Sequence, residues 1–69
     1  MNGKRYIDNR GWIYFVRAGL GLDTFNTFYK KPGKSGAHSS HMTQFKPTVE
    51  EAQADLDALA AKKGWEEVI

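Results

Sequence analysis

The chain has 69 residues, 41% of them hydrophobic and 13% aromatic, with no cysteine and a formal net charge of +2. This length allows one domain with one small core, so we expect residues 1–69 to form a single domain. The cysteine-free composition excludes disulfides and thiolate metal sites and fits a reducing compartment. No apolar run approaches the roughly 20 residues of a membrane helix, and no apolar signal region follows Met1, so we expect a cytoplasmic protein with no membrane partner.

The charge is divided between two parts of the chain. Residues 1–46 carry eight Lys and Arg against two acids, a net charge of +6, whereas residues 47–69 carry two Lys against six acids, a net charge of −4. The basic part is rich in aromatic and β-branched residues, and the acidic part has the pattern of one helix with a short tail. A basic, strand-forming part favours contact with a polyanion.

The basic part predicts three strands. The segment of residues 12–17 is almost entirely aromatic or β-branched, which favours a strand. Asn9-Arg10-Gly11 before it has the composition of a turn, and Pro32-Gly33 fits the centre of a type II turn. The ranges expected as strands are 12–17, 24–31 and, with more polar residues, 39–45.

The acidic part predicts one capped helix. Thr48 and Glu51 fit a capping box, and Gly64 fits the position after a helix end, with Trp65 folding back on the last turn. The residues expected on the buried stripe of this helix are Val49, Ala52, Leu56, Leu59 and Ala60. Residues 65–69 fit a short edge strand. The predicted fold is therefore α+β: an antiparallel sheet of three or four strands with one helix packed on one face, in the order β-β-β-α(-β).

The surest strand is apolar on both faces, although one helix can cover only one face of a sheet. We expect Ile13 and Phe15 in the core, because Trp12 and Tyr14 each carry a polar group suited to a partly wetted surface. In an alternative arrangement, loop residues cover the second face: Leu20, Leu22 and Trp65.

The sequence predicts neither an enzyme nor a cofactor or metal site. His38 and His41 would point to opposite faces of a strand, and no cysteine or nearby acid completes a set of four ligands. A nucleophile with its base cannot be assembled either, because the acids belong to the helix or to loops.

The predicted function is non-catalytic binding of nucleic acid by an uncovered sheet face and basic hairpin tips. Basic tips reach phosphates, and strands can enter the major groove of DNA. As an alternative, Trp12 and Tyr14 can stack on single-stranded bases. The candidate binding residues are Arg10, Trp12, Tyr14, Arg17, Asn26, Thr27, Tyr29, Lys30, Lys31 and Lys34.

About residues 5–63 resemble a known family. The aromatic strand, the basic hairpin and the stretch of residues 45–52 are together similar to the small amino-terminal DNA-binding domain of phage-type tyrosine integrases. The resemblance implies a three-stranded sheet on one helix, whose sheet face docks in the major groove of double-stranded DNA. The positions that match the family motif are structural ones: Phe45, Thr48, Glu51 and Ala52.

A second interpretation is a small protein-interaction module, such as an accessory or inhibitor protein of a mobile element. The Thr-x-x-Glu-Ala entry to the helix also resembles HicB-type antitoxins, which implies a toxin protein as the partner. Trp12, Tyr14 and a strand edge would then form the contact. Under either interpretation we expect a monomer or a weak dimer.

Overall fold

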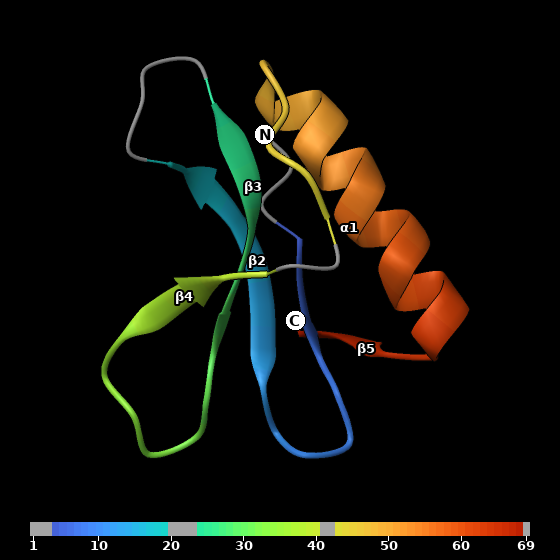
Figure 1. Cartoon of the computed structure of the whole chain (residues 1–69). Helices are drawn as coiled ribbons and strands as arrows, with labels where there is room; N and C mark the ends of the chain where they lie inside the picture. Colours follow the sequence, from blue (N-terminus) through green and yellow to red (C-terminus); the bar gives the residue numbers. More distant parts are fainter. Residues whose placement is uncertain (1–3, 20–23, 41–42, 69) are drawn as a thin grey trace.

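A computed structural model describes residues 4–19, 24–40 and 43–68 of the chain, so Leu20, Leu22 and His41 lie outside the described residues. The described residues form a five-stranded antiparallel sheet with the spatial order β4-β3-β2-β1-β5 and one helix (Figure 1). The elements are β1 (Arg5–Ile7), β2 (Ile13–Ala18), β3 (Phe25–Lys30), β4 (Ala37–Ser39), α1 (Val49–Lys63) and β5 (Glu66–Val68).

The predicted α+β class is confirmed, whereas the sheet has five strands in place of three or four. The additional strand is β1, which pairs with β2 through Tyr6 opposite Tyr14 and Ile7 opposite Ile13. β5 is the expected edge strand at the end of the chain, and it pairs with β1. A three-residue strand such as β1 gives little signal in the sequence, because pairing on both sides is what stabilises it.

The chain after β4 leaves the sheet and meets it again just before the helix. Lys46 exchanges two backbone hydrogen bonds with Phe25, of 2.7 and 2.8 Å. Asn26 is 2% exposed and links this segment to β3: its Nδ2 donates to the Ser40 carbonyl (3.3 Å), and its Oδ1 accepts from Thr43 Oγ1 (2.6 Å). The strand expected over residues 39–45 is therefore corrected to the short β4 and a single bridge at Lys46.

Both predicted helix caps are confirmed. Thr48 Oγ1 accepts from the Glu51 backbone N–H (3.2 Å) and donates to the Glu51 carboxylate (3.0 Å). Gly64 has φ 76°, and the N–H groups of Gly64 and Trp65 both donate to the Ala60 carbonyl, at 2.8 and 2.9 Å. These bonds satisfy backbone groups that a helix leaves unpaired at its ends.

α1 lies across one face of the sheet, where it contacts β2 and β3 (Figure 1). Its buried residues are Ala52, Gln53, Leu56 and Ala60. Gln53 was not expected in this set; its Nε2 donates to the Lys4 carbonyl (3.3 Å) and to Asp57 Oδ1 (2.9 Å). Asp57 also accepts from the Tyr6 hydroxyl at 2.7 Å. These polar contacts join α1 to β1 and to the residue just before it.

The helix covers the face of the sheet opposite to the one predicted. Tyr14 is 1% exposed, and its ring stacks on that of Trp65 with 3.9 Å between the ring centroids. Because side chains alternate along a strand, Ile13 and Phe15 point away from α1. The expectation that Ile13 and Phe15 form the core is therefore wrong.

Two features of the neighbouring residues explain why Tyr14 is buried. Its hydroxyl donates to the Asp8 carboxylate at 2.9 Å, so the polar group of the phenol is satisfied without water. The covering helix presents two buried alanines, Ala52 and Ala60, and we infer that the large rings of the sheet fill the space they leave. A polar group on an aromatic residue therefore did not indicate exposure in this chain.

Candidate nucleic-acid interface

The side chains of the sheet that point away from α1 form one surface, which we call the open face. Paired residues point to the same side of a sheet, and the register pairs Ile7 with Ile13, Phe15 with Phe28, and Ile13 with Lys30. No described helix or strand packs over this surface. The basic and large apolar residues of β1, β2 and β3 on this side, which define the open face, are Arg5, Ile7, Ile13, Phe15, Arg17, Phe28 and Lys30.

The open face has an apolar centre and a basic rim. Its two isoleucines and two phenylalanines are partly exposed, whereas Arg5, Arg17 and Lys30 are exposed. The Arg17 guanidinium lies 5.1 Å from the centroid of the Phe28 ring, so its stem extends over the apolar centre. Among the described strand residues, one acid lies on this side: Glu66 of the edge strand β5, which is paired with Ile7.

The β1–β2 and β3–β4 connections lie at the same end of the sheet, the lower end in Figure 1. A Cβ placed on Gly11 would be 3.6 Å from Pro32 Cγ, an ordinary contact distance, so the two connections lie close together. Gly11 has φ 86°, a conformation that favours glycine. The fold thus brings together basic residues from two separate hairpins.

Trp12 is the centre of this end of the sheet. Its ring is nearly parallel to that of Tyr29, with 5.3 Å between centroids and an interplanar angle of 10°. The Arg10 guanidinium carbon lies 3.7 Å from the Trp12 ring centroid, and Lys31 Nζ lies 5.0 Å from it. We call Arg10, Trp12, Tyr29 and Lys31 the tip cluster.

The Asp8 carboxylate fixes the position of Arg10 in the tip cluster. Its side chain is 3% exposed, and its carboxylate accepts from the backbone N–H groups of Arg10 (2.8 Å) and Trp12 (3.0 Å). It also accepts from Arg10 Nη2 and from the Tyr14 hydroxyl, both at 2.9 Å. Burial by itself would raise the pKa of Asp8, but the hydrogen bonds from Arg10, Trp12 and Tyr14 outweigh it and lower the pKa below its usual value.

Tyr6 and Tyr14 have raised pKa values, so both phenols remain protonated well above neutral pH. Burial and then the hydrogen bond to Asp8 raise the pKa of Tyr14 to about 12. The hydrogen bond to Asp57, followed by burial, raises the pKa of Tyr6 to about 12. Both phenols therefore act as hydrogen-bond donors that join elements of the fold.

The structure divides the ten predicted binding residues into three groups. Tyr14, Asn26 and Thr27 are buried, with at most 2% exposed, so the expectation that they are accessible to a partner is wrong. Tyr14 lies under Trp65, Asn26 is bonded to the segment after β4, and Thr27 is on the helix side. The remaining two groups are the tip end, with Arg10, Trp12, Tyr29, Lys31 and the exposed Lys34, and the open face, with Arg17 and Lys30.

Sequence reasoning missed five residues of the open face: Arg5, Ile7, Ile13, Phe15 and Phe28. The alternation of side chains along β2 contained the signal, since the set of residues opposite Tyr14 was identified. The assignment of the two sets to core and surface was inverted, because it relied on the polar groups of Trp and Tyr.

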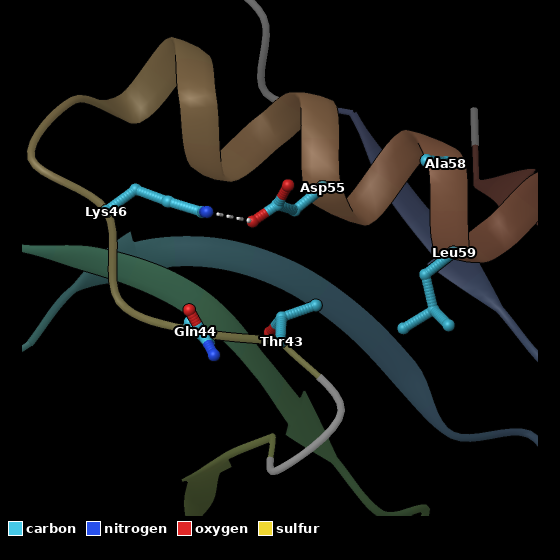
Figure 2. Close-up of a pocket in the computed structure, with 6 residues that line it drawn as sticks. All are labelled: Thr43, Gln44, Lys46, Asp55, Ala58 and Leu59. Carbon is cyan, nitrogen blue, oxygen red and sulfur yellow. Dashed lines mark ion pairs between the residues drawn. The ribbon is translucent and has the colours of Figure 1, made fainter.

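A hollow of about 330 Å³ lies between α1 and the segment that precedes it (Figure 2). It is lined by Thr43, Gln44, Lys46, Asp55, Ala58 and Leu59. Its two charged groups are paired with each other, since Lys46 Nζ lies 3.4 Å from Asp55 Oδ2. This ion pair joins the segment before α1 to the middle of the helix, and the hollow presents no concentration of one charge.

Comparison with known proteins gives no further assignment: no family model, curated protein or solved structure matches the chain. Within the described part of the chain, no three His, Asp or Glu side chains are grouped so that they could hold a metal ion. Among the same residues, no helix is long and apolar enough to cross a membrane. The open face and the tip cluster are therefore the two surfaces from which function is inferred.

Proposed function

We propose that this chain is a non-catalytic cytoplasmic module that binds double-stranded DNA through the open face. The observation that carries the proposal is the distribution of charge on the sheet. Three exposed cations, Arg5, Arg17 and Lys30, surround the apolar centre of the open face, whereas the acids of α1 lie on the other side of the sheet. Such a surface is complementary to the phosphates of a nucleic acid.

The spacing of the cations supports a duplex as the partner. Arg17 and Ile13 are four residues apart on β2, and Lys30 is paired with Ile13. Four residues of a strand span about 13 Å, which is close to the width of the major groove, about 12 Å. Arg17 and Lys30 would therefore reach phosphates on the two sides of the groove, while the apolar centre faces the base edges and the thymine methyl groups.

The resemblance to the integrase DNA-binding domain supports the same orientation, because the sheet face of that family also docks on DNA. In the proposed complex, α1 and its acids face away from the duplex. Lys31 and Lys34 at the tips extend the basic surface beyond the end of the sheet. Their contacts are with phosphates, which position the protein without reading sequence.

Titration of the chain with a generic DNA duplex at two salt concentrations, followed by NMR, tests this proposal. We expect the NMR signals of open-face residues to shift. The logarithm of the affinity should fall linearly with the logarithm of the salt concentration, with a slope of about 0.9 per phosphate contacted. The double charge reversal Arg17→Glu with Lys30→Glu should weaken binding more than about tenfold. The matched control is Lys62→Glu with Lys63→Glu, the same change of charge in the last turn of α1, which should leave most of the affinity.

Two results would exclude the proposed orientation. Absence of shifts at low salt would rule out DNA binding by the wild-type chain. Equal loss of affinity in the open-face and helix variants would show that only net charge matters, and that the open face has no particular role.

The apolar centre of the open face favours a protein partner as the second candidate. Four partly exposed apolar side chains on one uncovered sheet face fit the core of a protein interface: Ile7, Ile13, Phe15 and Phe28. Because Tyr14 is buried, this surface replaces the contact through Trp12 and Tyr14 that the sequence suggested. Binding to such a partner would depend on Phe15 more than on Arg17 and would change little with salt.

A further inference from the structure

The apolar centre of the open face is built around one pair of phenylalanines. Phe15 of β2 is directly opposite Phe28 of β3, so their Cβ atoms lie about 5 Å apart. Both side chains are partly exposed. Ile7 and Ile13 form a second opposed pair beside them, because Ile13 comes two residues before Phe15 on the same side of β2. The centre is therefore a continuous apolar surface across three strands.

Phe15 lies midway along β2 between the positions of the two cations that flank the centre. Arg17 follows Phe15 by two residues, and Ile13, which is paired with Lys30, precedes it by two. When Arg17 and Lys30 contact phosphates on the two sides of the major groove, Phe15 lies over the middle of the groove. Neighbouring strands are about 5 Å apart and stacked base pairs about 3.4 Å apart, so Phe28 then lies over a neighbouring base pair.

Side chains that read bases by hydrogen bonds are scarce around the phenylalanine pair. Asn and Gln read adenine through two hydrogen bonds, and Asn26 is the one amide in the described strands. Asn26 is 2% exposed; its Nδ2 donates to a backbone carbonyl and its Oδ1 accepts from Thr43, so both polar atoms are used within the fold. Ser39, opposite Phe28 on β4, is partly exposed, but a serine hydroxyl does not distinguish one base from another.

The major groove offers one apolar group to such a surface. Every base pair presents hydrogen-bond donors or acceptors there, and thymine adds its C5-methyl group, which a phenylalanine ring can contact. An apolar ring placed over a donor or an acceptor removes water without replacing the hydrogen bond, which weakens binding. Contact with a methyl group removes apolar area from water, which strengthens binding. The phenylalanine pair therefore favours a groove in which methyl groups are presented.

We propose that the open face recognises the C5-methyl groups of thymine, so that its ligand is A·T-rich duplex DNA. Phe15 and Phe28 contact methyl groups on neighbouring base pairs, while Arg17 and Lys30 contact the phosphates on the two sides of the groove. This inference rests on the proposed function, because it names the kind of duplex that the same surface binds.

Replacement of single groups in the DNA tests this inference. A duplex in which deoxyuridine replaces every thymine keeps the charge and the base pairing and lacks only the methyl groups. We expect the wild-type chain to bind it about tenfold more weakly than the thymine duplex, because each of two lost methyl contacts costs about threefold to fourfold in affinity. In a duplex of G·C pairs alone, 5-methylcytosine in place of cytosine should strengthen binding by a similar factor. Fluorescence anisotropy at one salt concentration compares the four duplexes.

Two matched variants test whether the open face makes the methyl contact. Phe15→Val removes the ring and keeps an apolar side chain that favours a strand. Phe25→Val makes the same change on the α1 side of β3, where Phe25 is opposite Ala18 and is also partly exposed. We expect the ratio of thymine to deoxyuridine affinity to fall about threefold in Phe15→Val and to stay unchanged in Phe25→Val. Because the ratio is taken within one variant, a loss of folded protein affects both affinities equally and cancels.

The outcomes distinguish methyl recognition from the proposed function. Equal affinity for the thymine and deoxyuridine duplexes, in a chain that binds both, would overturn methyl recognition alone. No binding of any duplex at low salt would overturn the proposed function, and this inference with it. A loss with deoxyuridine that 5-methylcytosine does not mirror would assign the effect to the shape of the duplex and overturn the direct contact. Equal falls of the ratio in Phe15→Val and Phe25→Val would show that the open face does not make the contact.

Discussion

At the scale of single residues, the Asp8 carboxylate stabilises the structure of the first hairpin. One carboxylate accepts hydrogen bonds from two backbone N–H groups, from the Arg10 guanidinium and from the Tyr14 hydroxyl. It closes the turn, permits the burial of Tyr14 and orients Arg10 toward the Trp12 ring. The core and the tip cluster thus share one side chain, which the sequence presents only as an acid next to a turn.

The first prediction concerns Asp8→Asn. The folded-state pKa of Asp8 is lower than the unfolded value of about 3.9, so its stabilisation is complete above that value and is lost as the pH falls through the folded pKa. We expect Asp8→Asn to lower the free energy of unfolding by about 2 kcal/mol at neutral pH, with the difference shrinking in acid. Urea unfolding at several pH values measures this.

The control for Asp8 is Asp55→Asn. Asp55 forms an ion pair with Lys46, and its side chain is 36% exposed, so its loss should cost less than about 1 kcal/mol. A difference between wild type and Asp8→Asn that stays constant down to strong acid would contradict the role of the ionised carboxylate.

Thr27 gives a second prediction at this scale. Its side chain is fully buried, and its Oγ1 has no hydrogen-bond partner among the described residues. Thr27→Val keeps the shape and the strand preference and removes the unsatisfied hydroxyl, so the free energy of unfolding should rise by about 1 kcal/mol. Thr43→Val is the matched substitution and should lower the free energy of unfolding, because the Thr43 hydroxyl donates to Asn26 at 2.6 Å. Thermal unfolding of both variants checks this, and a destabilised Thr27→Val would refute it.

At the scale of elements, the ends of α1 are set by local interactions. The capping box of Thr48 and Glu51 and the left-handed Gly64 use residues within four positions of each other in the chain. Such interactions depend on residues close together in the chain, so the bounds of the helix could be predicted from the sequence. The strands differ, because each needs a partner from another part of the chain.

Gly64 gives the prediction that belongs to this scale. Its φ of 76° is unfavourable for an L side chain, and nothing lies within 4 Å of the position of a Cβ. Gly64→Ala should therefore lower the free energy of unfolding by about 1 kcal/mol through backbone strain alone. Gly36→Ala is the control, since Gly36 has equal space and no positive φ, and it should be neutral or slightly stabilising. Equal denaturation midpoints for the two variants would contradict the expected backbone strain at position 64.

At the scale of the whole molecule, the division of charge along the chain becomes a division between two sides of a sheet. α1 carries acids on one side, and the open face carries cations on the other. Of the two acids in the described strands, Glu66 points to the open side, while its neighbour Glu67 pairs with Tyr6 and points to the helix side. This pair of glutamates allows a test of which side faces DNA.

The prediction at this scale is that Glu66→Lys strengthens duplex binding. The substitution replaces an acid at the edge of the open face by a cation, and we expect an affinity about fivefold higher at low salt with a steeper salt dependence. Glu67→Lys makes the same change of charge one residue away on the helix side and should have a smaller effect. Fluorescence anisotropy with a labelled duplex measures both. A larger gain for Glu67→Lys would place the DNA on the helix side.

The sequence alone determined the helix with its caps, the turn before β2, the turn at Pro32, and the two sets of side chains on β2, because each of these depends on residues close together in the chain. It did not determine which set is buried. That choice was made by contacts with distant residues: Trp65 stacks on Tyr14, and Asp57 accepts from Tyr6, 51 positions away. Since alternation fixes only that neighbouring side chains point in opposite directions, the tertiary structure decided which face is open and so which surface can meet a partner.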